Sequence, residues 1–254
     1  MTDQGLKYLE GDLSSISNQE NFSKIEEILS SHKDSTCQKV ILFGTGAYCP
    51  IHIGHLQSYD IAAKFLKEEF DFEVIAGYIS PSCDRYLSYK FHKHSIPQKP
   101  ISFYHRYQMI RLACEDHNKQ PDVIPIFPSG WEGLQPRTVS HRLVTDHFRH
   151  ALKEKFPNED IFVLYIAGAD LFCRCKISGW SSCVVIDRLD TEYSIAEYST
   201  NLDKKVYICH DPKYSQFFSN ASSTQIRRLL EENKSIDGLT YSSVVEYILT
   251  NHLQ

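Results

Sequence analysis

Short apolar runs alternate with longer amphipathic segments along most of the chain, and this order constrains the fold more than any other feature. The runs lack the every-second-residue polarity of a half-exposed strand, so they are typical of strands buried on both faces of a sheet. The expected strands are residues 39–43, 73–79, 123–126, 161–167, 182–186 and 205–209. The expected helices are residues 55–70, 102–116, 139–156, 223–233 and 241–253, with a polar loop before the second of them. Helices between buried strands predict an α/β fold with a doubly wound parallel sheet and helices on both faces.

Length and charge limit the classes of partner. The chain has 254 residues, of which 42% are hydrophobic, enough for a substantial core, and its formal net charge is −5. Proteins that bind nucleic-acid backbone or membrane surfaces usually carry a basic surplus, so we expect neither partner. Residues 22–29 have helical spacing, with Ser17 and Glu20 as an expected capping box. We therefore predict an N-terminal helical extension (residues 1–36) docked on a main domain (residues 37–254).

The cysteines and the N-terminus indicate the compartment. Eight cysteines are scattered along the chain without a CxxC pair, which is typical of reduced thiols in a reducing environment. The first residues lack a basic stretch followed by an apolar segment, and no run approaches eighteen consecutive apolar residues. We expect an intracellular protein, cytoplasmic or nuclear, without a secretion signal.

The stretch GTGAYCPIHIGHL, residues 44–56, follows the first expected strand and leads into a helix. It is not a dinucleotide fingerprint, because Cys49 stands where the third glycine is needed, and the chain has no P-loop. Backbone N–H groups at a helix start attract phosphate, and His52 and His55, three residues apart, can reach one anion. One alternative is a plain glycine-rich turn with two incidental histidines. Another is a pair of zinc-binding histidines, but the sequence offers no third cluster of ligands with the spacing of a metal site.

Two separated motifs resemble one superfamily. Residues Gly46 to His55 match the GxFxPxHxGH signature of the nucleotidylyltransferases, with Tyr48 in the aromatic place, and SSTQIRR at 222–228 resembles their second signature. Further segments resemble the nicotinamide or nicotinate mononucleotide adenylyltransferases, closest to the eukaryotic form. These segments are ISPSCDRY (79–86), YHRYQMIRLA (104–113), GWEGLQPRT (130–138) and GADLFCRCKISGW (168–180). The resemblance implies a Rossmann-like sheet and adenylyl transfer from ATP to a pyridine mononucleotide, with release of pyrophosphate.

The resemblance also implies roles for individual residues. His55 and His52 would contact ATP phosphates and Arg227 the departing pyrophosphate, making these three the expected catalytic residues. Since adjacent helical residues point about 100° apart, only Arg227 or Arg228 is expected to face the site. The expected ATP-binding residues are Gly46, Ala47, Tyr48, His52, His55, Gly168, Asp170, Ser222, Ser223, Thr224 and Arg227. The expected mononucleotide-binding residues are Tyr86, Lys90, Trp131, Thr138, Trp180 and Arg188.

Mg²⁺ is expected as the cofactor that ATP brings, coordinated by phosphates and water, without a metal ligand from the protein. The chain departs from the family pattern at Ala47, where a serine is usual, and at residues 87–90, where the family has a run of lysines. His105 and Arg106 are expected to tie loops together. The histidine-rich segment 141–150 is interpreted as a solvated helix face in preference to a metal site.

Three functions remain compatible with the sequence. The first is synthesis of NAD from nicotinamide mononucleotide, nicotinate mononucleotide or both. The second is nucleotidylyl transfer to another phosphate acceptor, and the third is a nucleotide-binding sensor or chaperone with weak catalysis. The pyridine preference and the oligomeric state, including a homo-oligomer, are left open by the sequence.

Overall fold

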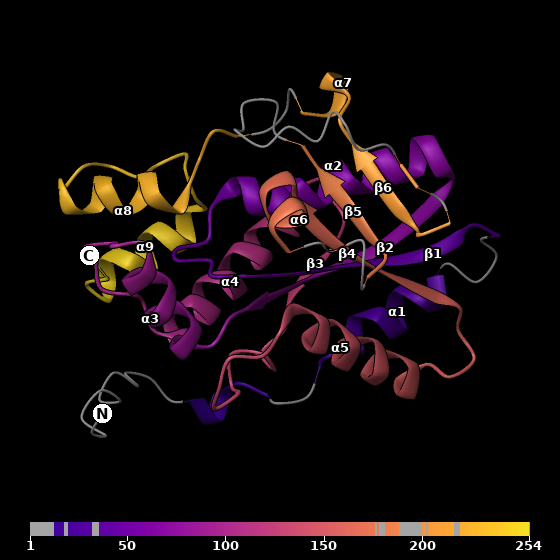
Figure 1. Cartoon of the computed structure of the whole chain (residues 1–254), viewed down its shortest axis with the longest axis horizontal. Coiled ribbons are helices and arrows are strands. Elements are labelled where there is room, and N and C mark those ends of the chain that lie inside the picture. The colour runs from indigo at the N-terminus through magenta and orange to yellow at the C-terminus, as the bar shows by residue number, and fades with distance from the viewer. Residues whose placement is uncertain are drawn as a thin grey trace.

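A six-stranded parallel sheet forms the centre of the protein (Figure 1). The computed structural model describes residues 13–17, 20–31, 36–175, 177, 181–187, 200–201, 203–215 and 219–253. Its strands are β1 (Gln38–Gly46), β2 (Phe72–Pro81), β3 (Ile126–Pro128), β4 (Ile161–Gly168), β5 (Cys183–Ile186) and β6 (Val206–Cys209). Their order is β3-β2-β1-β4-β5-β6, with parallel pairing throughout. The predicted doubly wound α/β fold is confirmed, and its strand order reverses between β1 and β4, where such sheets bind ligands.

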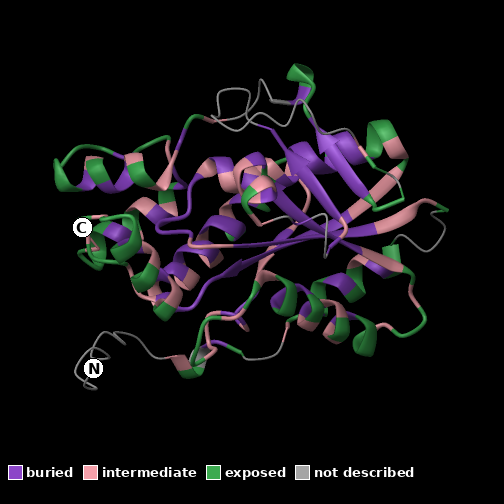
Figure 2. Cartoon of the chain, in the orientation of Figure 1, coloured by how far each residue is buried: buried purple, intermediate pink, exposed green. Residues whose placement is uncertain are grey.

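Helices cover both faces of this sheet. They are α1 (Ser23–Ser31), α2 (Ile53–Phe70), α3 (Asp84–Lys93), α4 (Phe103–His117), α5 (His141–Lys155), α6 (Ala169–Cys175), α7 (Pro212–Ser215), α8 (Ser223–Glu231) and α9 (Ser242–Thr250), with a short 3-10 turn at Leu13–Ser15. Alternate side chains of β1 belong to two separate cores. Val40 and Leu42 pack with α2, α4, α8 and α9, whereas Ile41 and Phe43 pack with α1, α5 and α6. Strands are therefore buried and outer helix faces exposed (Figure 2).

Tyr59 of α2 lies where β1 and β2 run side by side. Its hydroxyl donates a hydrogen bond of 2.8 Å to the carbonyl of Tyr78. A Cβ added at Gly44 of β1 would lie 2.5 Å from the Tyr59 hydroxyl, and a Cβ at Gly77 of β2 would lie 2.5 Å from its ring. Both strands therefore need a glycine here, because the ring occupies the space of either side chain.

The N-terminal part packs on the sheet, but its helix starts later than predicted. The capping box of Ser17 and Glu20 is wrong: α1 begins at Ser23, whose backbone N–H donates to Asn21 Oδ1 at 3.1 Å. Glu20 instead accepts a hydrogen bond from Ser129 Oγ at 2.7 Å. Phe22 lies in the same core cluster as Phe148 of α5. The division of the chain at residue 36 stays a prediction.

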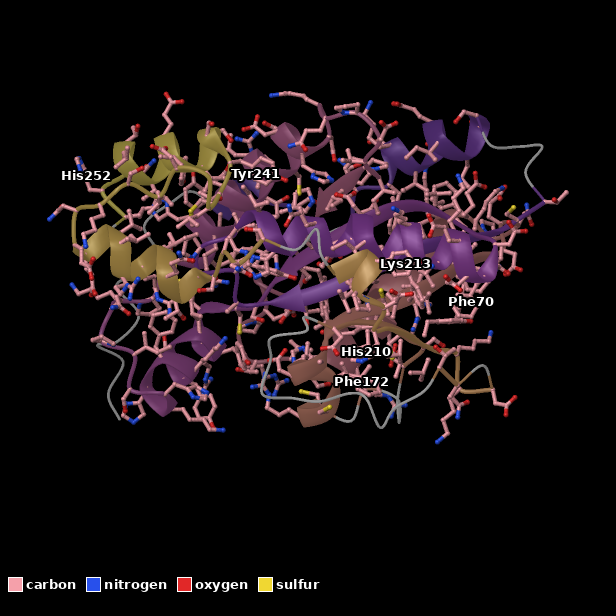
Figure 3. The ribbon with its side chains drawn as sticks, turned by 90° about the horizontal axis from the view of Figure 1, so that it is seen from above. Phe70, Phe172, His210, Lys213, Tyr241 and His252 are labelled. Atoms are coloured by element: carbon pink, nitrogen blue, oxygen red, sulfur yellow. The ribbon has the colours of Figure 1, made fainter. Side chains whose placement is uncertain are left out.

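Two further contacts tie the outer helices together. Lys213 of α7 lies over α2 and bonds to Glu69 Oε1 at 2.8 Å (Figure 3). Tyr241, just before α9, meets the buried His117 of α4, with 3.0 Å between the hydroxyl and Nδ1. Within the described ranges, no helix combines the length and the apolar character needed to cross a bilayer.

Candidate active site

A pocket of about 460 Å³ opens at the carboxyl ends of β1 and β4. Its lining comes from β1 and the loop after it, the first turn of α2, α3, the start of α5, α6 and the start of α8, which converge from distant parts of the chain (Figure 1). Ten predicted site residues line it: Gly46, Ala47, Tyr48, His52, His55, Tyr86, Lys90, Gly168, Asp170 and Ser223. The pocket therefore lies at the reversal of strand order, where α/β sheets bind ligands.

The loop between β1 and α2 is shaped by a close backbone approach. Tyr48 has a φ of 44°, in the left-handed region, and the following Cys49–Pro50 peptide bond is cis. The Tyr48 ring lies directly against Gly46, where an added Cβ would come within 3.0 Å of it. The same ring meets His55 edge-on, with 4.9 Å between ring centroids. A side chain at position 46 would therefore require the Tyr48 ring to move by a few tenths of an ångström.

The two histidines form one unit at the start of α2. The backbone N–H of His52 donates to His55 Nδ1 at 3.1 Å. The rings lie 3.6 Å apart between centroids, tilted by 32°, and the His52 side chain is buried. Because Nδ1 of His55 accepts this hydrogen bond, the neutral ring carries its proton on Nε2. The Nε2–H group is therefore the hydrogen-bond donor of the neutral His55 ring.

Helix α8 is fastened to the same loop by the second motif. Ser222 caps the helix by accepting from the Gln225 N–H at 3.1 Å, and Ser223 Oγ donates to the Pro50 carbonyl at 2.8 Å. Arg227, 9% exposed, donates from Nη1 to the Cys49 carbonyl at 2.6 Å. Ser223 lines the pocket, whereas Ser222, Thr224 and Arg227 are not among its lining residues.

Only one of the two neighbouring arginines is buried, and whether it faces a bound ligand stays a prediction. Arg227 Nη2 also donates to Thr224 Oγ1 at 3.2 Å, and burial lowers the pKa of its guanidinium. Arg228 is 66% exposed and faces Glu232. Arg227 therefore joins α8 to the loop that carries the histidines.

Charged side chains at the pocket mouth are mainly cationic. Lys90 of α3 and Arg174 of α6 line the pocket, and Asp170 is the acid among the described lining residues. Burial, and then the charge of Arg174, lower the pKa of Lys90. No three His, Cys, Asp or Glu side chains of the described residues come together as a metal ligand set. The pocket chemistry thus suits an anion with several oxygen atoms.

Two features of the pocket wall are corrections to the sequence analysis. Residues 84–93 form α3, where a polar loop was predicted; Leu87 and Phe91, four residues apart, bury its inner face. His141 does not belong to a solvated helix face, because it lines the pocket and its Nδ1 lies 2.7 Å from Thr45 Oγ1. Burial, then Arg174, lower the pKa of His141. Its place at the start of α5 depends on how that helix meets β1, which the helical pattern does not encode.

The remaining predicted mononucleotide contacts lie away from the pocket lining or outside the described residues. Trp131 stacks on His147 of α5, with 3.9 Å between ring centroids and 14° between planes. Thr138 is exposed before α5. Trp180 and Arg188 lie outside the described residues. The contacts predicted for these four residues stay predictions.

Arg106 has the structural role that its position in the sequence suggested. Its side chain is fully buried and donates to the carbonyls of Ile101, Ala47 and Ser82 at 2.7–3.0 Å, and to Asp84 Oδ1 at 2.9 Å. The guanidinium thus joins three loops beneath the pocket.

Comparisons with known proteins agree with this geometry. Nicotinamide/nicotinic acid mononucleotide adenylyltransferase 1 of Saccharomyces cerevisiae is 25% identical over 244 residues, covering 84% of this chain and 55% of the yeast protein. The Arabidopsis thaliana nicotinamide/nicotinic acid mononucleotide adenylyltransferase is 26% identical over 243 residues, covering 88% of this chain and 92% of the plant protein. The chain thus spans little more than half the length of the yeast relative and nearly all of the plant one.

A solved structure supports the fold. The Plasmodium falciparum nicotinic acid mononucleotide adenylyltransferase complexed with NaAD aligns with a TM-score of 0.54 and 20% identity, covering 85% of this chain and 97% of that one. The family model described as Cytidylyltransferase-like matches residues 43–229, a span that holds both histidines, the pocket and the SSTQIRR segment. Because that match takes in most of the sheet and the whole pocket lining, the chain belongs to the cytidylyltransferase-like family.

Proposed function

We propose that the protein transfers the adenylyl group of ATP to nicotinamide mononucleotide, nicotinate mononucleotide or both, forming NAD⁺ or its deamido form and pyrophosphate. The observation that carries this proposal is the His52–His55 unit, which opens into a cation-rich pocket at the reversal of strand order. The printed names of the yeast and plant relatives supply the substrate class.

In this reaction a phosphate oxygen of the mononucleotide attacks the α-phosphorus of ATP, and the bond between that phosphorus and the bridging oxygen breaks. Such transfers depend on in-line placement and on stabilising the negative charge spread over the phosphate oxygens. His55 would donate from Nε2 to an α-phosphate oxygen in the transition state, with His52 beside it. Because His55 Nδ1 already accepts a backbone hydrogen bond, the donor is oriented before ATP binds.

The pyrophosphate would leave toward the start of α8. Ser223 lines the pocket as the first residue of α8, and the backbone N–H groups at the start of a helix stabilise anions. Arg227 would act as a positioning residue, because its guanidinium is committed to the Cys49 carbonyl of the histidine loop. Mg²⁺ would enter with ATP and neutralise its phosphates, held by phosphate oxygens and water.

Tyr86 and Lys90 of α3 are the pocket residues proposed for the mononucleotide side. Roles for Trp131, Thr138, Trp180 and Arg188 stay predictions of the family resemblance. An intracellular location, a homo-oligomer and the lack of nucleic-acid or membrane partners are likewise predictions from the sequence alone.

A pyrophosphate-release assay with Mg²⁺ tests the proposal. The purified protein would be given ATP or CTP, paired with nicotinamide mononucleotide, nicotinate mononucleotide or pantetheine phosphate. We expect pyrophosphate, and the matching dinucleotide by chromatography, with ATP and at least one pyridine mononucleotide. Release only with CTP or with pantetheine phosphate would indicate another nucleotidylyltransferase. Binding of ATP without release in any pairing would replace the enzyme with a nucleotide-binding protein.

A further inference from the structure

One peptide group joins the C-terminal part of the chain to the histidines of the pocket. The hydroxyl of Thr240 donates a hydrogen bond of 3.0 Å to the carbonyl of Ile51. The N–H of the same peptide group belongs to His52 and donates to Nδ1 of His55 at 3.1 Å. A chain of hydrogen bonds therefore has Thr240 at one end and His55, which lines the pocket, at the other.

This chain of hydrogen bonds runs through a buried part of the protein. Thr240 is 4% exposed, and Ile51 is fully buried. In surroundings of low dielectric, successive hydrogen bonds polarise one another, so a donor on the carbonyl makes the N–H of the same peptide group a better donor. A peptide group is also planar and turns as a unit, so the contact that fixes its carbonyl fixes the direction of its N–H as well.

The segment that carries Thr240 is itself held on both sides. Before it, the carbonyl of Leu239 accepts a hydrogen bond of 3.1 Å from the N–H of Ile53, at the start of α2. After it, the hydroxyl of Tyr241 lies 3.0 Å from Nδ1 of the buried His117, and α9 then runs beside α4 (Figure 1). The Thr240 hydroxyl thus reaches the histidine loop from a segment that is anchored to two other helices.

We propose that Thr240 is a positioning residue, which sets the tautomer and the direction of the His55 ring through the peptide group between Ile51 and His52. This inference rests on the proposed function, in which His55 donates from Nε2 to a phosphate oxygen. While Nδ1 accepts from the peptide N–H, the proton of the neutral ring stays on Nε2. Without the Thr240 hydroxyl the bond to Nδ1 weakens, and the ring form with its proton on Nδ1 gains population. That form presents an acceptor at Nε2, where a phosphate needs a donor.

NMR of the free protein, labelled with ¹⁵N in its histidines, measures the tautomer directly. Two-bond ¹H–¹⁵N spectra distinguish a ring protonated on Nε2 from one protonated on Nδ1, and His55→Ala identifies the signals of His55 by their loss. At pH 8, where a histidine ring is ordinarily neutral, we expect the wild-type ring to be protonated on Nε2. Thr240→Val keeps the shape of the side chain without its hydroxyl and should move the signals toward the Nδ1-protonated form. Thr240→Ser should restore the wild-type spectrum.

Kinetics in the pyrophosphate assay measure what the tautomer contributes. Thr240→Val should lower kcat about 10-fold, the effect of one buried hydrogen bond, and leave KM for ATP and for the mononucleotide within about 2-fold. Thr240→Ser should recover the rate, because it restores the donor. In a His55→Ala background, Thr240→Val should change kcat by less than about 2-fold, since the ring on which it acts is gone.

Thr145 provides a matched control. It is fully buried, and its hydroxyl also donates to a backbone carbonyl, that of His141, at 2.8 Å and one turn earlier on α5. Thr145→Val therefore removes a buried hydroxyl without touching the histidine loop, and it should leave kcat and the His55 signals unchanged. Thermal melting of each variant shows that it is folded at the assay temperature.

The outcomes separate this inference from the proposed function. If the wild-type protein forms no dinucleotide, the proposed function fails, while the NMR spectra still test the link from Thr240 to His55. An unchanged His55 tautomer in Thr240→Val would overturn the inference whatever the enzyme does. So would an equal loss of kcat in Thr145→Val, a failure of Thr240→Ser to recover the rate, or a full 10-fold effect of Thr240→Val in the His55→Ala background.

Discussion

Glu132 carries the clearest pH dependence of stability in the described structure. It follows Trp131, is 3% exposed and accepts a hydrogen bond from Ser80 Oγ at 3.0 Å. Burial raises the pKa of its carboxyl from 4.5 to about 7, partly opposed by hydrogen bonds and by Arg106. In the native protein the carboxyl is therefore half protonated near neutral pH, while in the unfolded chain it is ionised.

The sign follows from which state binds the proton more tightly. Below pH 4.5 the group is protonated in both states, and its contribution to stability is complete. As the pH rises through about 7 the native carboxyl ionises, and the contribution is lost. A shift from 4.5 to about 7 corresponds to roughly 3 kcal/mol at 1.36 kcal/mol for each pH unit. Glu132→Gln stays neutral at every pH and removes this loss.

Urea unfolding of the wild type and Glu132→Gln at pH 5 and pH 8 measures the effect. The unfolding free energy of the variant minus that of the wild type should be larger at pH 8 than at pH 5, by an amount on the order of 3 kcal/mol. Comparing the two proteins at each pH cancels groups that titrate in both, including Glu20, whose pKa burial also raises to about 7. Glu154→Gln, with a side chain 69% exposed, is the control. An unchanged difference between pH 5 and pH 8 would refute the reasoning.

Three further predictions follow from contacts already described. His55→Ala should lower kcat on the order of 100-fold in the pyrophosphate assay without changing the melting temperature, because we propose that the residue donates in the transition state; normal turnover would contradict that role. Arg106→Lys should cost about 3 kcal/mol or more in urea unfolding, since carbonyls would lose their donors in a buried site, whereas the exposed Arg111→Lys should be neutral. Phe148→Ala should cost about 3–5 kcal/mol, since its ring is fully buried and stacks on Phe43 at 4.5 Å; a smaller loss would mean that the core closes over the cavity.

The strands and the place of the pocket could be predicted because both depend on local patterns. Strands buried on both faces are continuous apolar runs in the sequence, which predicts where they lie. The GTGAYCPIHIGHL stretch identified the loop at which β1 ends. Helix α3 was missed because only Leu87 and Phe91 bury its face, in a segment otherwise polar. Two apolar residues four positions apart are too weak a signal to distinguish a helix from a loop.

Two pocket-lining residues, on α5 and α6, could not be predicted. His141 and Arg174 line it because α5 and α6 meet the sheet edge at particular positions, which depend on packing between elements. The stacking of Trp131 on His147 of α5 likewise depends on packing between elements and could not be predicted. The sequence predicts which residues share a face of one helix or strand. It does not predict how far apart two helices lie, because that depends on how their side chains pack in the core.

The place of Tyr59 between two strands has a consequence for which substitutions the chain tolerates together. Its ring excludes a side chain at Gly44 and at Gly77 by similar overlaps, so these two positions are coupled through a third residue that belongs to another element. Replacing either glycine in the wild-type background is strongly unfavourable. In a Tyr59→Ala background an alanine at Gly77 would fill space that the ring has vacated, whereas an alanine at Gly44 would also require Ile166, whose Cγ2 lies 2.9 Å from the added Cβ, to shift. Tyr59 is thus a site of epistasis, because the residue at this position affects which side chains β1 and β2 tolerate in place of Gly44 and Gly77.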